Sequence, residues 1–270
     1  MKPVADIPLA ILGGVKAVLT DIDDTLTLRG RLPAVAYQAL EQLRAAGVLV
    51  IPVTGRPAGW CDMIARQWPV DAVVGENGAF YFAYGDKAKR MDRVYAQAKT
   101  ERDANTARLW AIARRVLKDF PGTAIASDQA YREIDVAIDF CEDVPALPLA
   151  TAQAIAEAFA RDGATAKVSS IHVNAWYGPH DKLSMSLKLL QERFGISGEA
   201  ARDCVAYCGD SPNDAPMFEG FQLGVGVANI RPLAHLMTHL PAYVTAGEGG
   251  TGFAEFADMV LRAKAALTHA

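Results

Sequence analysis

The chain has 270 residues, of which 51% are hydrophobic and 21% are charged, which excludes the polar excess of a disordered protein. Lysine and arginine total 27 against 31 acidic residues, so the formal net charge is −4 and neither nucleic acid nor an anionic membrane is an expected partner. The first apolar stretch, residues 7–12, is too short to span a membrane, and no cleavage site is clear. The four cysteines form no C-x-x-C pair. We therefore expect a cytoplasmic protein with free thiols.

The first part of the chain alternates short apolar runs with helical patterns. Residues 15–20 (VKAVLT) are rich in branched side chains and predict a buried strand. A helix is expected over 33–46, with a proline in its first turn and a glycine after its end. Further buried strands are expected at 48–53 and 71–74, and Pro57 marks the start of another helix.

The pattern changes after residue 84. Helical spacing predicts helices over 101–118 and 151–161. Apolar and polar residues alternate over 132–140 and over 167–176, as they do in half-buried antiparallel strands. This middle segment is typical of a separate small α+β unit.

The first pattern returns from Lys182, with a helix expected over 183–194 and strands over 204–208 and 222–227. Strand–helix units that bracket an insert predict an α/β fold, with a doubly wound, Rossmann-like parallel-sheet core and an inserted α+β cap. We expect the core to comprise residues 1–83 and 180–270, and the cap residues 84–179.

Polar motifs follow three of the expected core strands. These motifs are DIDDT at 21–25, TGR at 54–56 and GDSPND at 209–214. Because the carboxyl ends of parallel strands meet at one sheet edge, at least four carboxylates should gather there. Such a cluster is costly without a cation, and its oxygen ligands suit Mg²⁺.

These motifs resemble those of the haloacid dehalogenase superfamily. DIDDT matches the first motif D-x-D-x-T, Thr54 the second, Lys182 the third and GDSPND the acidic fourth, in order along the whole chain. The resemblance implies a Mg²⁺-dependent phosphatase, a phosphoric monoester hydrolase that passes the phosphoryl group through an aspartate.

The resemblance also assigns the catalytic roles. Asp21 would be the nucleophile, and Asp23 would protonate the leaving oxygen and later deprotonate water. Thr54 and Lys182 would bind the transferring phosphoryl group. Relatives with a similar cap usually have a glycine after this lysine, whereas Leu183 stands here, so Lys188 is an alternative.

The metal ligands implied are the Asp21 carboxylate, the Asp23 backbone carbonyl and Asp210. Asp214 would be a further ligand or would support the others. Gly55 and Asn213 are expected to contact the phosphate or substrate, while Arg56 either contacts substrate or forms a surface ion pair.

The cap pattern resembles that of the subclass IIB enzymes, which include sucrose-phosphate, mannosyl-phosphoglycerate and Cof-like phosphatases. Asn77, in a Glu-Asn-Gly sequence, either contacts substrate or only forms a turn. Ser170, His172 and Asn174 share one face of the strand expected over 167–176. That face either contacts a sugar or is solvated.

We therefore expect a phosphatase for a small phosphorylated metabolite, such as a phosphosugar or sugar-conjugate phosphate. The alternatives are a phosphomutase or a non-catalytic protein that binds phosphometabolites. Thr54 follows Asp21 by only 33 residues, which leaves no room for the helical cap usual in the mutases. A homodimer is compatible with the sequence.

Overall fold

A six-stranded parallel sheet forms the centre of the computed structural model, which describes residues 1–268. The doubly wound α/β core predicted from the sequence is confirmed. In spatial order the strands are β1 (Lys2–Pro3), β13 (Tyr243–Val244), β12 (Leu223–Gly226), β11 (Val205–Gly209), β2 (Ala17–Thr20) and β3 (Leu49–Pro52).

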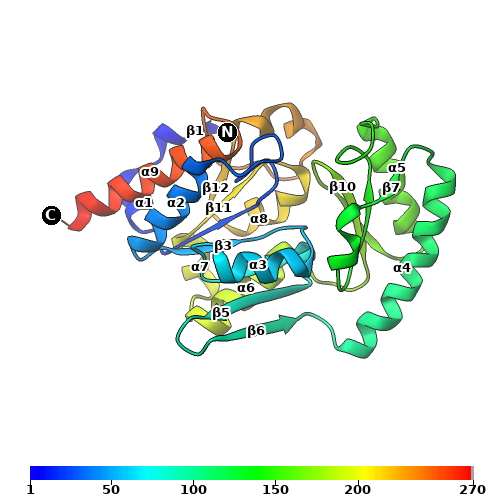
Figure 1. Cartoon of the computed structure of the whole chain (residues 1–270). Coiled ribbons are helices and arrows are strands. Elements are labelled where there is room, and N and C mark those ends of the chain that lie inside the picture. The colour runs from blue at the N-terminus through cyan, green and yellow to red at the C-terminus, as the bar shows by residue number, and fades with distance from the viewer. Residues whose placement is uncertain (269–270) are drawn as a thin grey trace.

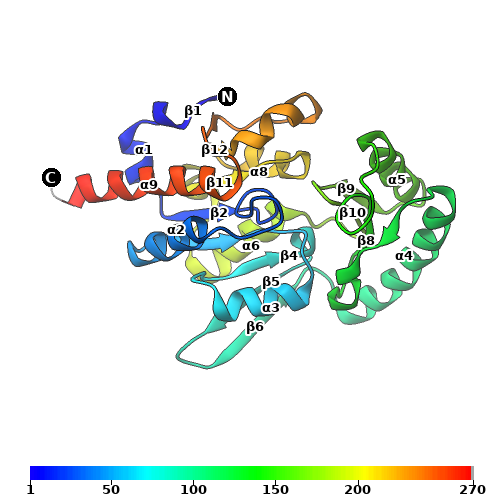
Figure 2. The same ribbon diagram turned by 45° about the horizontal axis from the view of Figure 1, so that its top comes forward.

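Helices cover both faces of this sheet (Figures 1 and 2). One layer contains α1 (Leu9–Gly13), α2 (Ala34–Ala45), α3 (Ala58–Gln67) and α9 (Gly249–Thr268). The other contains α6 (Lys182–Phe194), α7 (Gly198–Cys204) and α8 (Ala215–Gly220). Among residues 1–268, no helix has both the length and the apolar character that crossing a membrane requires.

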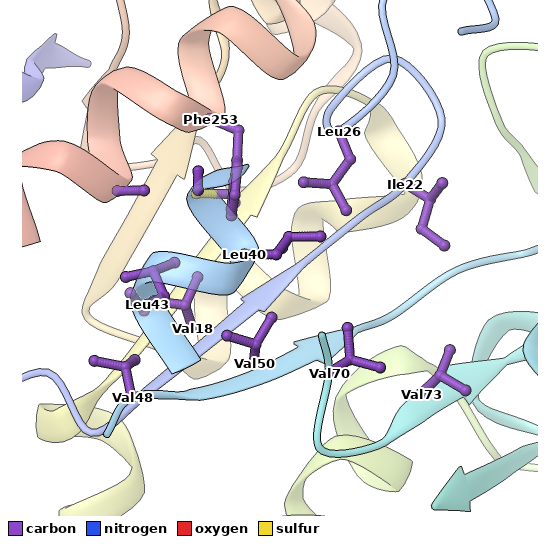
Figure 3. Close-up of a cluster of buried hydrophobic side chains, with 14 of the residues drawn as sticks. Val18, Ile22, Leu26, Leu40, Leu43, Val48, Val50, Val70, Val73 and Phe253 are labelled. Carbon is purple, nitrogen blue, oxygen red and sulfur yellow. The ribbon is translucent and has the colours of Figure 1, made fainter. Parts of the chain in front are cut away.

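The sheet is apolar on both faces, which explains the uninterrupted hydrophobic runs of its strands. Neighbouring side chains of β2 point to opposite layers: Val18 packs with Leu40 and Phe253 in one core (Figure 3), and Leu19 belongs to the other. Burial of one such side chain stabilises the fold by about 1.5–3 kcal/mol.

A three-stranded antiparallel sheet extends the core beside β3. It consists of β4 (Val73–Gly75), β5 (Phe80–Gly85) and β6 (Arg90–Tyr95). A parallel bridge between Val53, just after β3, and Val74 of β4 links it to the core. The expected border at residue 84 falls inside β5. Strand β6 was missed because it lies at the surface, where charged side chains are tolerated. We propose that the cap begins after β6.

The cap forms a separate lobe, on the right in Figures 1 and 2. Two helices, α4 (Lys99–Asp119) and α5 (Leu149–Arg161), pack against a four-stranded antiparallel sheet. Its strands, in spatial order, are β7 (Ala124–Ile125), β8 (Val136–Asp139), β10 (His172–Trp176) and β9 (Thr165–Val168). The helices predicted over 33–46, 101–118, 151–161 and 183–194 match α2, α4, α5 and α6 within two residues at each end.

The single strand expected over 167–176 is wrong, because a turn divides it into β9 and β10. The Ser169 hydroxyl oxygen accepts hydrogen bonds from the backbone N–H groups of Ile171 and His172, at 3.3 and 3.0 Å. Serine side chains that bond locally to the backbone in this way favour turns over extended strands.

Candidate active site

Three strand ends bring the predicted motifs together at one edge of the sheet. Strands β11, β2 and β3 are neighbours, and Asp210, Asp21 and Thr54 lie at or just beyond their carboxyl ends. All three side chains are buried. Carboxylate oxygens of Asp21, Asp210 and Asp214 lie within 4.8 Å of one another.

Lys182 is the lysine that reaches this cluster. Its Nζ lies 3.0 Å from Asp21 Oδ1 and 2.8 Å from Asp214 Oδ1. The residue begins α6, and Asp181 caps that helix by accepting a hydrogen bond from Ser184 N at 2.7 Å. Lys188 lies two turns along the same helix, where its Nζ is 4.0 Å from the half-exposed Glu192. The geometry thus favours Lys182 as the lysine that pairs with phosphate.

Both oxygens of Asp214 are occupied by donors from the protein. Oδ1 accepts from Lys182 and from the Tyr207 hydroxyl, while Oδ2 accepts from the backbone N–H groups of Asp210 and Ser211. Of its two expected roles, the structure favours support over direct ligation. Tyr207 was missed, since in the sequence it is one apolar residue of a buried strand.

The cluster fits a divalent cation. Burial raises the pKa of Asp21 to about 7, against the opposing effect of Lys182. Burial and the charges of Asp214 and Asp21 also raise the pKa of Asp210. Three carboxylates face one ammonium, so two negative charges remain for a bound Mg²⁺ to neutralise. The residues that would hold it are Asp21, Asp210 and the backbone carbonyl of Asp23.

The loop after β2 is shaped to present these groups. Asp24 has a φ of 57°, so it is the turn residue of the motif, and its carbonyl oxygen accepts from Asn229 Nδ2 at 2.9 Å. Thr25 donates its hydroxyl to Asp210 Oδ1 at 3.0 Å and fixes the orientation of that carboxylate.

Arg56 is a buried junction between core and cap, so the surface ion pair considered for it is wrong. Its side chain is 7% exposed, and its Nε lies 2.9 and 3.1 Å from the two oxygens of Asp23. From the cap, Glu142 and Asp128 accept from the same guanidinium at 2.6 and 3.3 Å. The ring of Trp60 lies 4.4 Å from it.

These contacts shift the pKa values of both Arg56 and Glu142. Burial alone would lower the pKa of Arg56, but Asp23 and Glu142 outweigh it and raise that pKa. Burial also raises the pKa of Glu142, yet His172 and Arg56 together lower it to about 2. Arg56 therefore stays charged and Glu142 ionised at neutral pH.

The cap face that carries Ser170, His172 and Asn174 lies over Asp21 and Asp23. Both His172 and Asn174 are 2% exposed, so the solvated alternative is wrong. These three residues enclose a small cavity, here called the recess, which is also lined by Asp21, Asp23, Gly55, Arg56, Ser169, Ile171 and Asn213. Its volume is about 10 Å³, room for about one water.

Asn77 lies behind Gly55 in a left-handed backbone conformation, with φ 54°, so it does form a turn. Its backbone N–H donates to Thr54 O at 3.0 Å. Within residues 1–268 its buried Nδ2 has no hydrogen-bond partner. A Cβ at position 55 would lie 3.1 Å from that nitrogen and 3.5 Å from Asn174 Oδ1, so glycine keeps core and cap in close contact. Substrate contact by Asn77 stays a prediction.

Glu76, the residue before Asn77, was not expected to do more than belong to the turn. Its fully buried carboxylate accepts from Ala58 N at the start of α3. It also accepts from the backbone N–H groups of cap residues 133–135, at 2.7–3.0 Å. Nearby, Arg132 donates to the carbonyl of Gly55 at 2.8 Å. These contacts join the cap to the loops that carry the second motif.

Part of the chain matches a known family. The family model for haloacid dehalogenase-like hydrolases matches residues 18–104, which contain the first two motifs. No curated protein matches the chain. The match spans about the first third of the chain and supports the resemblance to haloacid dehalogenase-like hydrolases that the motifs predict.

Solved structures share the fold across nearly the whole chain. A Thermoplasma acidophilum protein, 0175, has a TM-score of 0.68 at 17% identity, covering 92% of this chain and 99% of its own. A HAD/COF-like hydrolase from Plasmodium vivax has a TM-score of 0.67 at 16% identity, covering 94% and 99%. A subclass IIB sugar phosphatase, BT4131, has a TM-score of 0.60 at 15% identity, with the same coverage.

Proposed function

We propose that this protein is a Mg²⁺-dependent phosphatase of small phosphorylated metabolites that works through an aspartyl-phosphate. The observation that carries the proposal is the buried contact of Lys182 with Asp21 beside the Asp210–Asp214 pair. Such a lysine compensates the charge of a carboxylate nucleophile and of a bound phosphoryl group at once.

Asp21 is the nucleophile of this reaction. Its Oδ1 is held by Lys182, which leaves Oδ2 to attack phosphorus in line with the leaving oxygen. The new bond joins Asp21 to phosphorus, and the bond between phosphorus and the leaving oxygen breaks. When bound, Mg²⁺ supplies positive charge that offsets the charge of the transferring group. Water then attacks phosphorus and restores the free carboxylate.

Thr54 is the residue that we assign to hold the phosphoryl group during both steps. Its hydroxyl oxygen accepts a hydrogen bond from Arg56 N at 3.0 Å, so the hydroxyl proton remains available for a phosphoryl oxygen. Because Thr54 is fully buried, this hydrogen bond would form away from bulk water.

Asp23 is the proposed acid and base. It gives its proton to the leaving oxygen and then takes one from the attacking water. Arg56 orients its carboxylate, and Glu142 of the cap holds Arg56. The cap thus helps to position the acid as well as to exclude water.

A phosphosugar or sugar-conjugate phosphate is the substrate class that we propose. The polar side chains of Ser170, His172 and Asn174 face the phosphoryl site. One structural neighbour is a sugar phosphatase, which supports the same class. A cytoplasmic location and a homodimer stay predictions. Mutase and binding-only functions are the alternatives.

Phosphate release from a panel of sugar phosphates, nucleotides and phosphopeptides tests this proposal. We expect turnover that EDTA abolishes, Mg²⁺ restores and Asp21→Asn eliminates. Asp24→Asn is the matched control, because it removes one carboxylate from the same loop at a turn position that asparagine tolerates. Turnover of Asp21→Asn at the parent rate, or turnover independent of metal, would refute the mechanism. A preference for nucleotides or phosphopeptides would refute the substrate class.

A further inference from the structure

A second, much larger cavity lies between cap and core, directly beside the recess. Its volume is about 540 Å³, within the range of about 300–1,000 Å³ that is usual for ligand sites. We call it the groove. Its apolar walls come from both lobes and include Phe140, Leu147 and Val168 of the cap and Pro216, Leu233 and Leu236 of the core.

The groove adjoins the phosphoryl site. Ser169, Ser170 and Asn213 line both the recess and the groove, so the β9–β10 turn and one core side chain separate the two. The recess holds about one water, so a phosphoryl group and the alcohol attached to it do not both fit there. A phosphoryl group bound at Asp21 would therefore direct the rest of its substrate past this turn and into the groove.

The groove has the wrong chemistry for a bare sugar. Among the described residues that line it there is no carboxylate, tyrosine, tryptophan or arginine, and its charged group is Lys167 at the exposed edge. Its uncharged polar side chains are Gln153, Ser211, Thr238 and the three that also line the recess, so the aliphatic wall is the part without hydrogen-bond partners. A sugar hydroxyl buried against aliphatic carbon would lose its hydrogen bonds to water without replacement. A hydrocarbon segment would instead gain from burial along this wall.

We propose that the groove binds an apolar segment of the leaving group, so that the substrate is the phosphate monoester of an amphipathic alcohol. This inference rests on the proposed function: the phosphoryl group lies at Asp21, the polar side chains shared by both cavities contact the hydroxyls nearest to it, and the groove takes the hydrocarbon. A sugar conjugate with an apolar substituent satisfies both halves of the site. The occupant is the substrate itself, because the groove adjoins the recess and shares Ser169, Ser170 and Asn213 with it.

A series of n-alkyl phosphates from ethyl to octyl measures the effect in turnover. We expect kcat/KM to rise about two- to fourfold per added methylene until the groove is filled. A rate that does not change with chain length, alongside good turnover of short esters or sugar phosphates, would overturn the groove inference and leave the phosphatase intact.

Calorimetric binding of ethylphosphonate and octylphosphonate in the presence of Mg²⁺ tests the groove without turnover. We expect octylphosphonate to bind at least about a hundredfold more tightly. Equal affinities would overturn the inference. Tight octylphosphonate binding by a protein that hydrolyses no phosphate ester would support the groove and refute the proposed function.

Two leucine variants test whether the dependence of kcat/KM on chain length arises in the groove. Leu149 lines the groove, is 36% exposed and is the first residue of α5, where an acidic side chain is favourable. Leu149→Asp should therefore fold, and its loss of kcat/KM should grow with chain length. Leu240→Asp is the control, because Leu240 is 46% exposed and lies outside the groove.

The same variants decide between a substrate and a second copy of the chain as the occupant. Light scattering should show the same mass for parent and Leu149→Asp. A dimer of the parent that Leu149→Asp dissociates, with no dependence on chain length, would assign the groove to a subunit interface and overturn the proposal.

Discussion

His180 should make the stability of this protein depend on pH in the weakly acidic range. The residue lies in the loop between β10 and α6, is 6% exposed and stacks on Trp176 with ring centroids 5.8 Å apart. Within residues 1–268, neither ring nitrogen has a hydrogen-bond partner. Burial lowers the pKa of His180 from 6.5 to about 4, with a smaller opposing effect from Asp181.

The direction of this pH dependence follows from which state, folded or unfolded, binds a proton at His180 first as the pH falls. As the pH falls below about 6.5, the unfolded chain takes up the proton while folded His180 stays neutral. Stability is thus fully present above pH 6.5 and is lost progressively as the pH falls towards 4. Between about pH 7.5 and 5.5 this single group costs about 1.4 kcal/mol of unfolding free energy.

Urea unfolding of the parent and of His180→Phe at these two pH values measures the effect. Phenylalanine keeps the stack on Trp176 but cannot bind a proton. We expect the parent to lose about 1.4 kcal/mol more than His180→Phe. His235→Phe, at an exposed position, should behave like the parent. Equal losses in the parent and His180→Phe would show that His180 is not held neutral by burial.

Three further substitutions test the site. Lys182→Met should lower kcat about a hundred- to a thousandfold in phosphate-release assays, whereas Lys188→Met should retain activity within about twofold; equal effects would refute the assignment. Thr54→Val should lower kcat about ten- to a hundredfold and Thr54→Ser should restore most of it, since only serine keeps the hydroxyl. Glu76→Gln should lower the free energy of unfolding by about 2–4 kcal/mol in urea, against little change for the exposed Glu41→Gln, and equal stabilities would contradict the role of Glu76 as an acceptor of backbone hydrogen bonds.

The sequence was sufficient to place the residues of the candidate site together, because parallel strands dictate the geometry of their carboxyl ends. Asp21, Thr54 and Asp210 each follow a buried strand, and neighbouring strands of a parallel sheet end at the same edge. Lys182 was predictable for a similar reason, since the start of α6 lies beside that edge. The apolar runs and helical spacing likewise gave the core helices and strands.

The junction between cap and core was beyond the reach of local patterns. Glu142 lies 86 residues after Arg56, and nothing in the sequence around either indicates the other. Glu76 accepts hydrogen bonds from backbone N–H groups. Every residue except proline has such a group, so the sequence does not show which residues donate. The turn at Ser169 was hidden because alternation of side chains continues through it, although a serine pair is a weak turn signal.

The hydrogen bonds between Glu76 and the cap bear on which inserts this core can accept. Its carboxylate recognises three consecutive main-chain amides of the cap and none of their side chains. Any insert that follows the same backbone path there would satisfy that anchor, whatever its sequence. This one anchor is therefore indifferent to the side chains of the insert, whereas the contacts of Arg56 with Glu142 and Asp128 depend on side chains of the cap. A chimaera that carries a foreign cap, with Glu76 retained, should inherit its chemistry from one parent and its selectivity from the other.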